Sequence, residues 1–105
     1  MPFGRLHVIT DLRPDRDPLV ALYAVQAALE AGARVVQVRG KGLSDRALYE
    51  LTCRVLELCT THGATCLVND RVHVALAAGA AGVHVGDDDL PVGAARRVLL
   101  WFVGT

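Results

Sequence analysis

The sequence predicts an α/β protein built on a parallel β-sheet, and three observations support this class. Short apolar runs alternate with longer stretches of helix-forming residues along the whole chain. Glycines stand where the helical stretches end, and no Asn-Gly or Asp-Gly hairpin signal lies between the strands. Strands buried on both faces read as continuous apolar runs, which also accounts for the hydrophobic content of 52%.

The first elements follow from local composition. A β-branched run over 6–10 predicts a strand, and the charged, proline-containing stretch over 11–18 predicts a loop. Strong helix formers over 19–31 predict a helix that Gly32 ends. Residues 33–38 are then expected to form the second strand.

Ser44 is the expected N-cap of a longer helix that runs to His62, because apolar residues recur behind it at steps of three and four. Gly63 ends this helix. The remaining elements are expected as a strand over 64–68, a short helix from 70 or 71 to 78, a strand over 82–85, a helix from Pro91 to Leu100 and the start of a fifth strand at 102–103. Such a series favours right-handed parallel crossovers.

Composition excludes several function classes. The 11 basic and 11 acidic residues balance, so nothing favours a nucleic acid or an anionic membrane as partner. The sequence has no uninterrupted apolar run of about 18 residues and no amino-terminal signal pattern, so we expect a cytoplasmic protein. Cys53, Cys59 and Cys66 are an odd number without C-x-x-C spacing, which favours buried apolar thiols over disulfides or zinc.

Polar clusters directly follow three of the apolar runs. Because the carboxyl ends of parallel strands form one shared rim, side chains from these distant stretches are expected to converge on a single site. The clusters are Gln37-Val-Arg39-Gly-Lys41, Asn69-Asp70 and Asp87-Asp88-Asp89.

The first cluster suits an anionic ligand. Arg39 and Lys41 alternate around Gly40, so they point to one side if the strand persists, with Gln37 on the same face. A guanidinium fork beside an ammonium group is a suitable clamp for a phosphate or pyrophosphate. The alternative is that Arg39 and Lys41 are solvated loop charges.

The two acidic clusters also have two interpretations each. Asn69-Asp70 is ordinary N-cap chemistry for the following helix, and Asp87 to Asp89 is a solvated acidic loop or a helix entry. Taken together, two carboxylates from different strand ends are what Mg²⁺ typically takes from a protein, with water and substrate phosphate completing its shell.

His84 is more typical of a hydrogen-bonded interior histidine than of a base or ligand. His7, His62 and His73 belong to no recognisable constellation.

The three motifs resemble, in order and spacing, the signatures of the thiamine phosphate synthase family, and residues 6–11 are also similar. The resemblance implies a TIM (β/α)₈ barrel and a transferase of thiamine biosynthesis. Its reaction joins 4-amino-2-methyl-5-hydroxymethylpyrimidine pyrophosphate to a thiazole phosphate, giving thiamine phosphate and pyrophosphate. The partners are therefore small phosphorylated substrates.

Carried over by position, the resemblance also implies residue roles. Pyrophosphate leaves first and the thiazole nitrogen captures the pyrimidine cation, so fixed cations and a metal stabilise the leaving group and no side-chain nucleophile is required. Substrate contacts fall on Gln37, Arg39, Lys41 and Asn69, and the Mg²⁺ ligands are Asp70 and Asp89. Two departures are Gly40, where the family usually has an acidic residue, and Asp87, where it usually has glutamine.

A complete barrel takes about 250 residues, so 105 residues predict one partial domain over 1–105, with four β/α units and the start of a fifth strand. Open parallel edges and an uncovered inner face favour homo-oligomerisation. Three hypotheses follow: a synthase-derived chain with the pyrimidine-pyrophosphate half-site, a catalytically incomplete half-barrel that binds phosphorylated ligands, and a protein like the thiazole tautomerases. Arg39, Lys41 and the two aspartates favour the first over the third, because isomerising a thiazole needs neither clamp nor metal.

Overall fold

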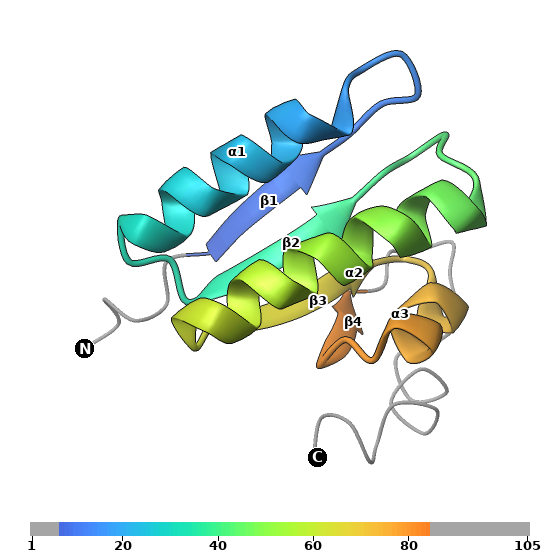
Figure 1. Cartoon of the computed structure of the whole chain (residues 1–105). Helices are drawn as coiled ribbons and strands as arrows, with labels where there is room; N and C mark the ends of the chain where they lie inside the picture. The colour runs from blue at the N-terminus through green and yellow to red at the C-terminus, as the bar shows by residue number, and fades with distance from the viewer. Residues whose placement is uncertain (1–6, 85–105) are drawn as a thin grey trace.

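The computed structural model describes residues 7–84, which form a four-stranded sheet with three helices (Figure 1). The predicted helix from Pro91 and the predicted strand at 102–103 lie outside these residues. The elements in chain order are β1 (His7–Asp11), α1 (Pro18–Glu30), β2 (Val35–Arg39), α2 (Asp45–His62), β3 (Thr65–Asn69), α3 (Val72–Ala78) and β4 (Gly82–His84).

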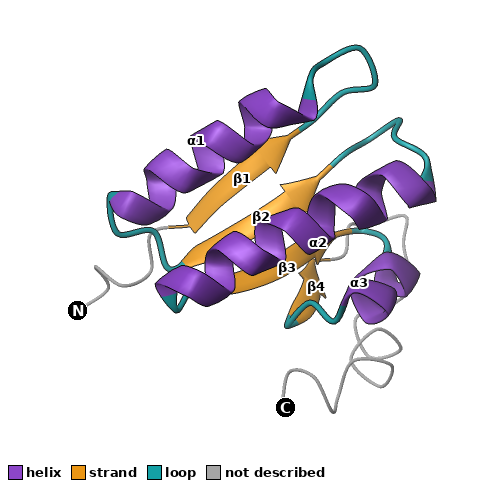
Figure 2. Cartoon of the chain, in the orientation of Figure 1, coloured by secondary structure: helices purple, strands orange, loops and turns teal. Residues whose placement is uncertain are grey.

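All four strands are parallel, and their spatial order β1-β2-β3-β4 is the order of the sequence. The helices lie on one face of the sheet, where α1 packs against α2 and α2 against α3 (Figure 2). A doubly wound sheet would carry helices on both faces, whereas sequential order with helices on one face is the winding of a barrel. The predicted α/β class is confirmed, and the winding is consistent with part of a barrel.

The ends of α1 and α2 follow local signals. The Ser44 hydroxyl accepts a hydrogen bond from the Ala47 N–H at 3.1 Å, so the predicted N-cap is confirmed. Gly63 ends α2 in the left-handed conformation, at φ 69°. Asp17 caps α1 by accepting from the Leu19 N–H at 2.9 Å, so this helix begins one residue earlier than predicted.

Strand ends depend on pairing with neighbours, and they differ from the prediction by one or two residues. β1 extends to Asp11 and β2 to Arg39 because these two residues are partners in the register. Helix α3 begins at Val72, and Arg71 holds its N-cap position without a capping side-chain bond. The interpretation of Asn69-Asp70 as that helix's N-cap is therefore wrong.

The core lies between the sheet and the helices. The helix-facing residues of the two central strands are exposed by no more than 1%: Val36, Val38, Cys66 and Val68. Cys59 and Cys66 are buried and Cys53 is half-buried, and all three thiols are free, as predicted for apolar side chains. A hydrogen bond with Cys59, together with burial, raises the pKa of the Cys66 thiol, which stays protonated. Within residues 7–84, no helix is both long and apolar enough to cross a membrane.

Candidate functional site

The carboxyl ends of β2 and β3 border a cavity of about 130 Å³ that is open to solvent. The loop after β2 contributes Arg39, Gly40 and Lys41 to its wall, and the end of β3 contributes the next segment of the chain. That second segment consists of Asn69, Asp70 and Arg71, and Leu48 of α2 completes the lining. Two of the three polar clusters therefore meet, as the parallel topology predicted.

Arg39 and Lys41 reach the cavity in different ways. Arg39 is the last residue of β2, but Lys41 lies in the turn beyond it, so the strand does not persist through both residues. At Gly40 between them, an added Cβ would lie 2.5 Å from Cδ1 of Leu43 and 3.0 Å from Cδ1 of Leu48. A side chain at position 40 would therefore require these two leucine side chains to move.

Gln37 supports the site from beside the cavity. It is 3% exposed and lies on the sheet face opposite the helices. Its Oε1 accepts a hydrogen bond from Asn69 Nδ2 at 2.7 Å, and its Nε2 lies 3.4 Å from His7 Nε2. Gln37 and Asn69 are brought together as predicted, but Gln37 acts on the amide of Asn69 and is not part of the cavity wall.

Asp70 has an unusual backbone. Its φ is 71°, and within residues 7–84 it is the one residue other than glycine with positive φ. The Arg71 N–H donates to the Asn69 carbonyl at 2.9 Å across Asp70, which is the pattern of a classic γ-turn. A strained backbone of this kind costs about 1–3 kcal/mol and persists where the surrounding contacts fix it. The turn directs the chain so that Asn69 and Asp70 both line the cavity.

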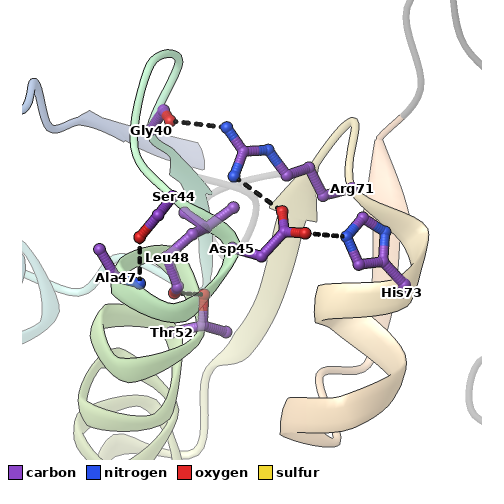
Figure 3. Close-up of polar contacts among 8 residues, drawn as sticks. All are labelled: Gly40, Ser44, Asp45, Ala47, Leu48, Thr52, Arg71 and His73. Atoms are coloured by element: carbon purple, nitrogen blue, oxygen red, sulfur yellow. Dashed lines mark hydrogen bonds and ion pairs between the residues drawn. The ribbon is translucent and has the colours of Figure 1, made fainter.

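A polar cluster that the sequence did not reveal borders the cavity (Figure 3). Arg71 Nη1 donates to Asp45 Oδ1 at 3.1 Å, and Arg71 Nη2 donates to the Gly40 carbonyl at 3.4 Å. His73 Nε2 lies 2.9 Å from Asp45 Oδ2. The hydrogen bond from His73, aided by the charge of Arg71, lowers the pKa of Asp45. Asp45 and Arg71 are 26 positions apart in the sequence, and no local spacing pairs them.

Positive charge prevails at the cavity. Three of its lining residues are cationic and Asp70 is the one carboxylate among them. Arg39 is also near Asp11, with Nε and Oδ1 3.8 Å apart, and both side chains remain partly exposed. Asp11 in turn lies 3.6 Å from Arg13. A concave site with excess positive charge attracts anions, and phosphate oxygens match the donors present.

The third cluster cannot be placed with the other two. Asp87, Asp88 and Asp89 lie outside the described residues, and of His84 only the backbone is described, at the end of β4. Among residues 7–84, no three His, Cys, Asp or Glu side chains gather into a metal site. Asp70 does supply carboxylate oxygens, the ligand type that Mg²⁺ prefers, beside cations suited to phosphate. Asp70 is the one described carboxylate of this rim that could take part in holding Mg²⁺.

Comparison with known proteins gives consistent matches. A family model described as Thiamine monophosphate synthase matches residues 6–105. The thiamine-phosphate synthase of Salinispora tropica is 61% identical over 99 residues, which cover 91% of this chain and 46% of that protein. The thiamine-phosphate synthase of Anaeromyxobacter dehalogenans is 55% identical over 96 residues, covering 91% of this chain and 40% of its own length.

A solved structure agrees with the sequence matches. A thiamine phosphate pyrophosphorylase from Pyrococcus furiosus superposes with a TM-score of 0.76 and 32% identity, covering 91% of this chain and 46% of that chain. The chain therefore spans about half the length of the relatives it matches. These matches confirm the resemblance indicated by the three motifs.

Proposed function

The chain belongs to the thiamine monophosphate synthase family, and from this premise we propose that its β2 and β3 rim binds the pyrophosphate group of a pyrimidine substrate. The reaction is the transfer of that pyrimidine to a thiazole phosphate, with release of pyrophosphate. The matched relatives are named thiamine-phosphate synthases, and we propose the corresponding reaction for this chain.

One observation carries the proposal. Arg39, Lys41, Asn69 and Asp70 come from strand ends about 30 positions apart in the sequence, yet they line one cavity. All four were expected from their motifs to contact substrate or metal.

The residues have distinct tasks in the proposed site. The guanidinium of Arg39 and the ammonium of Lys41 neutralise charge on the pyrophosphate and stabilise the additional charge that develops as it departs. The amide of Asn69, held by Gln37 at 2.7 Å, has its orientation fixed before the substrate binds. Preorganised donors of this kind contribute without rearranging during the reaction.

Magnesium belongs to the proposal as a cofactor. Asp70 would hold the ion from the β3 rim, and Asp89, outside the described residues, is the second proposed ligand. When bound, Mg²⁺ supplies positive charge to the pyrophosphate leaving group. Arg39 and Lys41 do the same from fixed positions on the protein.

The wider proposals concern ligands and assembly. Small phosphorylated molecules are the proposed substrates, and the cytoplasm is the proposed location. The open face of the sheet and its edge strand β1 are the proposed surfaces of a homo-oligomer, because Ile9 on that face is 57% exposed.

The proposal is tested by coupled turnover and by calorimetric binding of inorganic pyrophosphate, each with and without Mg²⁺. We expect the chain to bind pyrophosphate more tightly with Mg²⁺ and Lys41→Ala to weaken this binding about tenfold. Turnover that is lost in Asp89→Ala identifies an enzyme, whereas binding without turnover identifies a binding module. Absence of pyrophosphate binding by the unmodified chain contradicts the proposed function.

A further inference from the structure

Arg71 joins three separate segments at the edge of the cavity (Figure 3). Its two terminal nitrogens donate to the Gly40 carbonyl, in the loop after β2, and to Asp45, in the first turn of α2. Arg71 itself lies in the loop between β3 and α3. Its side chain therefore ties the loop after β3 to the loop after β2.

These two loops carry the polar residues of the cavity, and each contains one residue with positive φ. The loop after β2 contains Gly42 at φ 91°, a conformation that glycine adopts without cost. The loop after β3 contains the strained Asp70, whose conformation persists only where neighbouring contacts fix it. Arg71 follows Asp70 directly and is anchored through both its N–H and its guanidinium.

The solvent exposure of the bridge indicates what it contributes. The Asp45 side chain is 63% exposed and that of Arg71 24% exposed, and ion pairs near the surface add little to the free energy of unfolding. A guanidinium nevertheless fixes direction, because its donors form a rigid planar fork. His73 Nε2 lies 2.9 Å from the second oxygen of Asp45, so this contact orients the carboxylate.

We propose that Asp45 and Arg71 are positioning residues whose bridge holds Asn69 and Asp70 at the distance from Arg39 and Lys41 that a pyrophosphate group requires. The inference rests on the proposed function, since it concerns the same cavity. Asp45 does not line the cavity, so it acts through Arg71.

The first test measures binding of inorganic pyrophosphate, in the presence of Mg²⁺, by calorimetry. Asp45→Asn removes the charge of the bridge with little change of shape, and we expect about tenfold weaker binding, as is typical when a supporting residue of a polar site is changed. The matched control is Glu50→Gln, which removes the acid of the exposed Arg46–Glu50 pair on the same helix, where Nε and Oε2 are 3.7 Å apart. Equal affinities of Asp45→Asn and Glu50→Gln overturn the proposal.

A double-mutant cycle tests whether Asp45 and Arg71 affect pyrophosphate binding through the same bridge. Arg71→Lys keeps the charge but loses the planar fork, and we expect it to weaken pyrophosphate binding by about the same factor as Asp45→Asn. The double variant is then no weaker than either single variant, because all three lose the same bridge. Additive losses overturn the proposal.

A second readout does not depend on any ligand. Exchange of the Arg71 amide hydrogen reports on the turn across Asp70, because that N–H donates to the Asn69 carbonyl. We expect faster exchange in Asp45→Asn and wild-type exchange in Glu50→Gln. If exchange is unchanged in Asp45→Asn, the bridge does not order the loop after β3 and the proposal is overturned. If the wild-type chain binds no pyrophosphate, the proposed function fails, and the exchange comparison still decides whether the bridge orders the loop.

Discussion

The two faces of the sheet consist of alternate residues of the same strands, yet they differ in character. On the helix-covered face, Val36 and Val68 are completely buried among apolar side chains. On the opposite face, Ile9 is 57% exposed and Gln37 is engaged in hydrogen bonds with its neighbours. Since successive strand residues point to opposite faces, a one-residue step along a strand moves from the apolar core to the open face of the sheet. Substitutions on the two faces should therefore have separable effects.

The largest effect is expected in the helix-covered core. Leu51 of α2 is 3% exposed, and Leu51→Ala should lower the free energy of unfolding by about 2–5 kcal/mol because it leaves a cavity among packed side chains. Urea denaturation measures this loss. Leu19→Ala on α1 is the control. Because Leu19 is 43% exposed, this change should lower the free energy of unfolding much less. Similar losses for both leucines would mean that the core is not where the structure places it.

Gln37→Leu should have an intermediate effect, and it should lower both the free energy of unfolding and the affinity for pyrophosphate. The change removes the oxygen that accepts from Asn69 Nδ2 in a part-buried hydrogen bond, so we expect a loss of about 1 kcal/mol, at the lower end of the range for a buried donor. Pyrophosphate binding should weaken as well, because Asn69 loses its orientation. The matched control is Gln26→Leu on α1, where the glutamine bonds Glu30 at an exposed position. A Gln37→Leu chain with unchanged stability and affinity would contradict the supporting role of Gln37.

The predictable parts of this structure are those determined by neighbours in the sequence. Ser44 and Gly63 mark the ends of α2 through local capping chemistry, and both were predicted. Convergence of Arg39 with Asn69 also followed from sequence, because parallel strands place their carboxyl ends together. Family membership was predicted from three motifs and confirmed by the comparisons.

The unpredicted parts depend on contacts between distant residues. Asp70 was expected in a helix start, whereas its positive φ is set by a turn that local propensity does not specify. The bridge from Arg71 to Asp45 spans 26 positions, and the bond from Asn69 to Gln37 spans 32. His73 had no partner in the sequence pattern, because Asp45 lies on another helix. The roles proposed for all six site residues stay predictions: Gln37, Arg39, Lys41, Asn69, Asp70 and Asp89.

A smaller effect is expected on the open face of β1. Ile9→Thr should change the free energy of unfolding by no more than about 0.5 kcal/mol, because Ile9 is exposed, and should reduce self-association measured by sedimentation equilibrium. Val8→Thr is the comparison one step along the strand, where the side chain packs against the core, and it should be the more destabilising. Greater destabilisation by Ile9→Thr would reverse the assignment of the two faces.

The smallest expected effect is a pH dependence at Asp45. The bond from His73, aided by Arg71, lowers the pKa of Asp45 below its ordinary value of 3.8. A depressed folded-state pKa stabilises the fold above the unfolded-state value, and this contribution is lost as pH falls through the folded-state value. Asp45→Asn should therefore lower Tm slightly at neutral pH, and the difference from wild type should shrink below pH 3.8 and vanish only below the folded-state pKa of Asp45. A difference that grows as the pH falls would mean that folding raises the pKa of Asp45, and it would contradict this prediction.

The central claim, that the carboxyl end of β2 binds pyrophosphate, is tested most directly by comparing the two ends of that strand. Arg39 lies at the carboxyl end, beside the cavity, and exposed Arg34 precedes the amino end. Calorimetry with inorganic pyrophosphate and Mg²⁺ should show about tenfold weaker binding for Arg39→Ala and wild-type binding for Arg34→Ala. Equal affinities for the two variants would contradict the account.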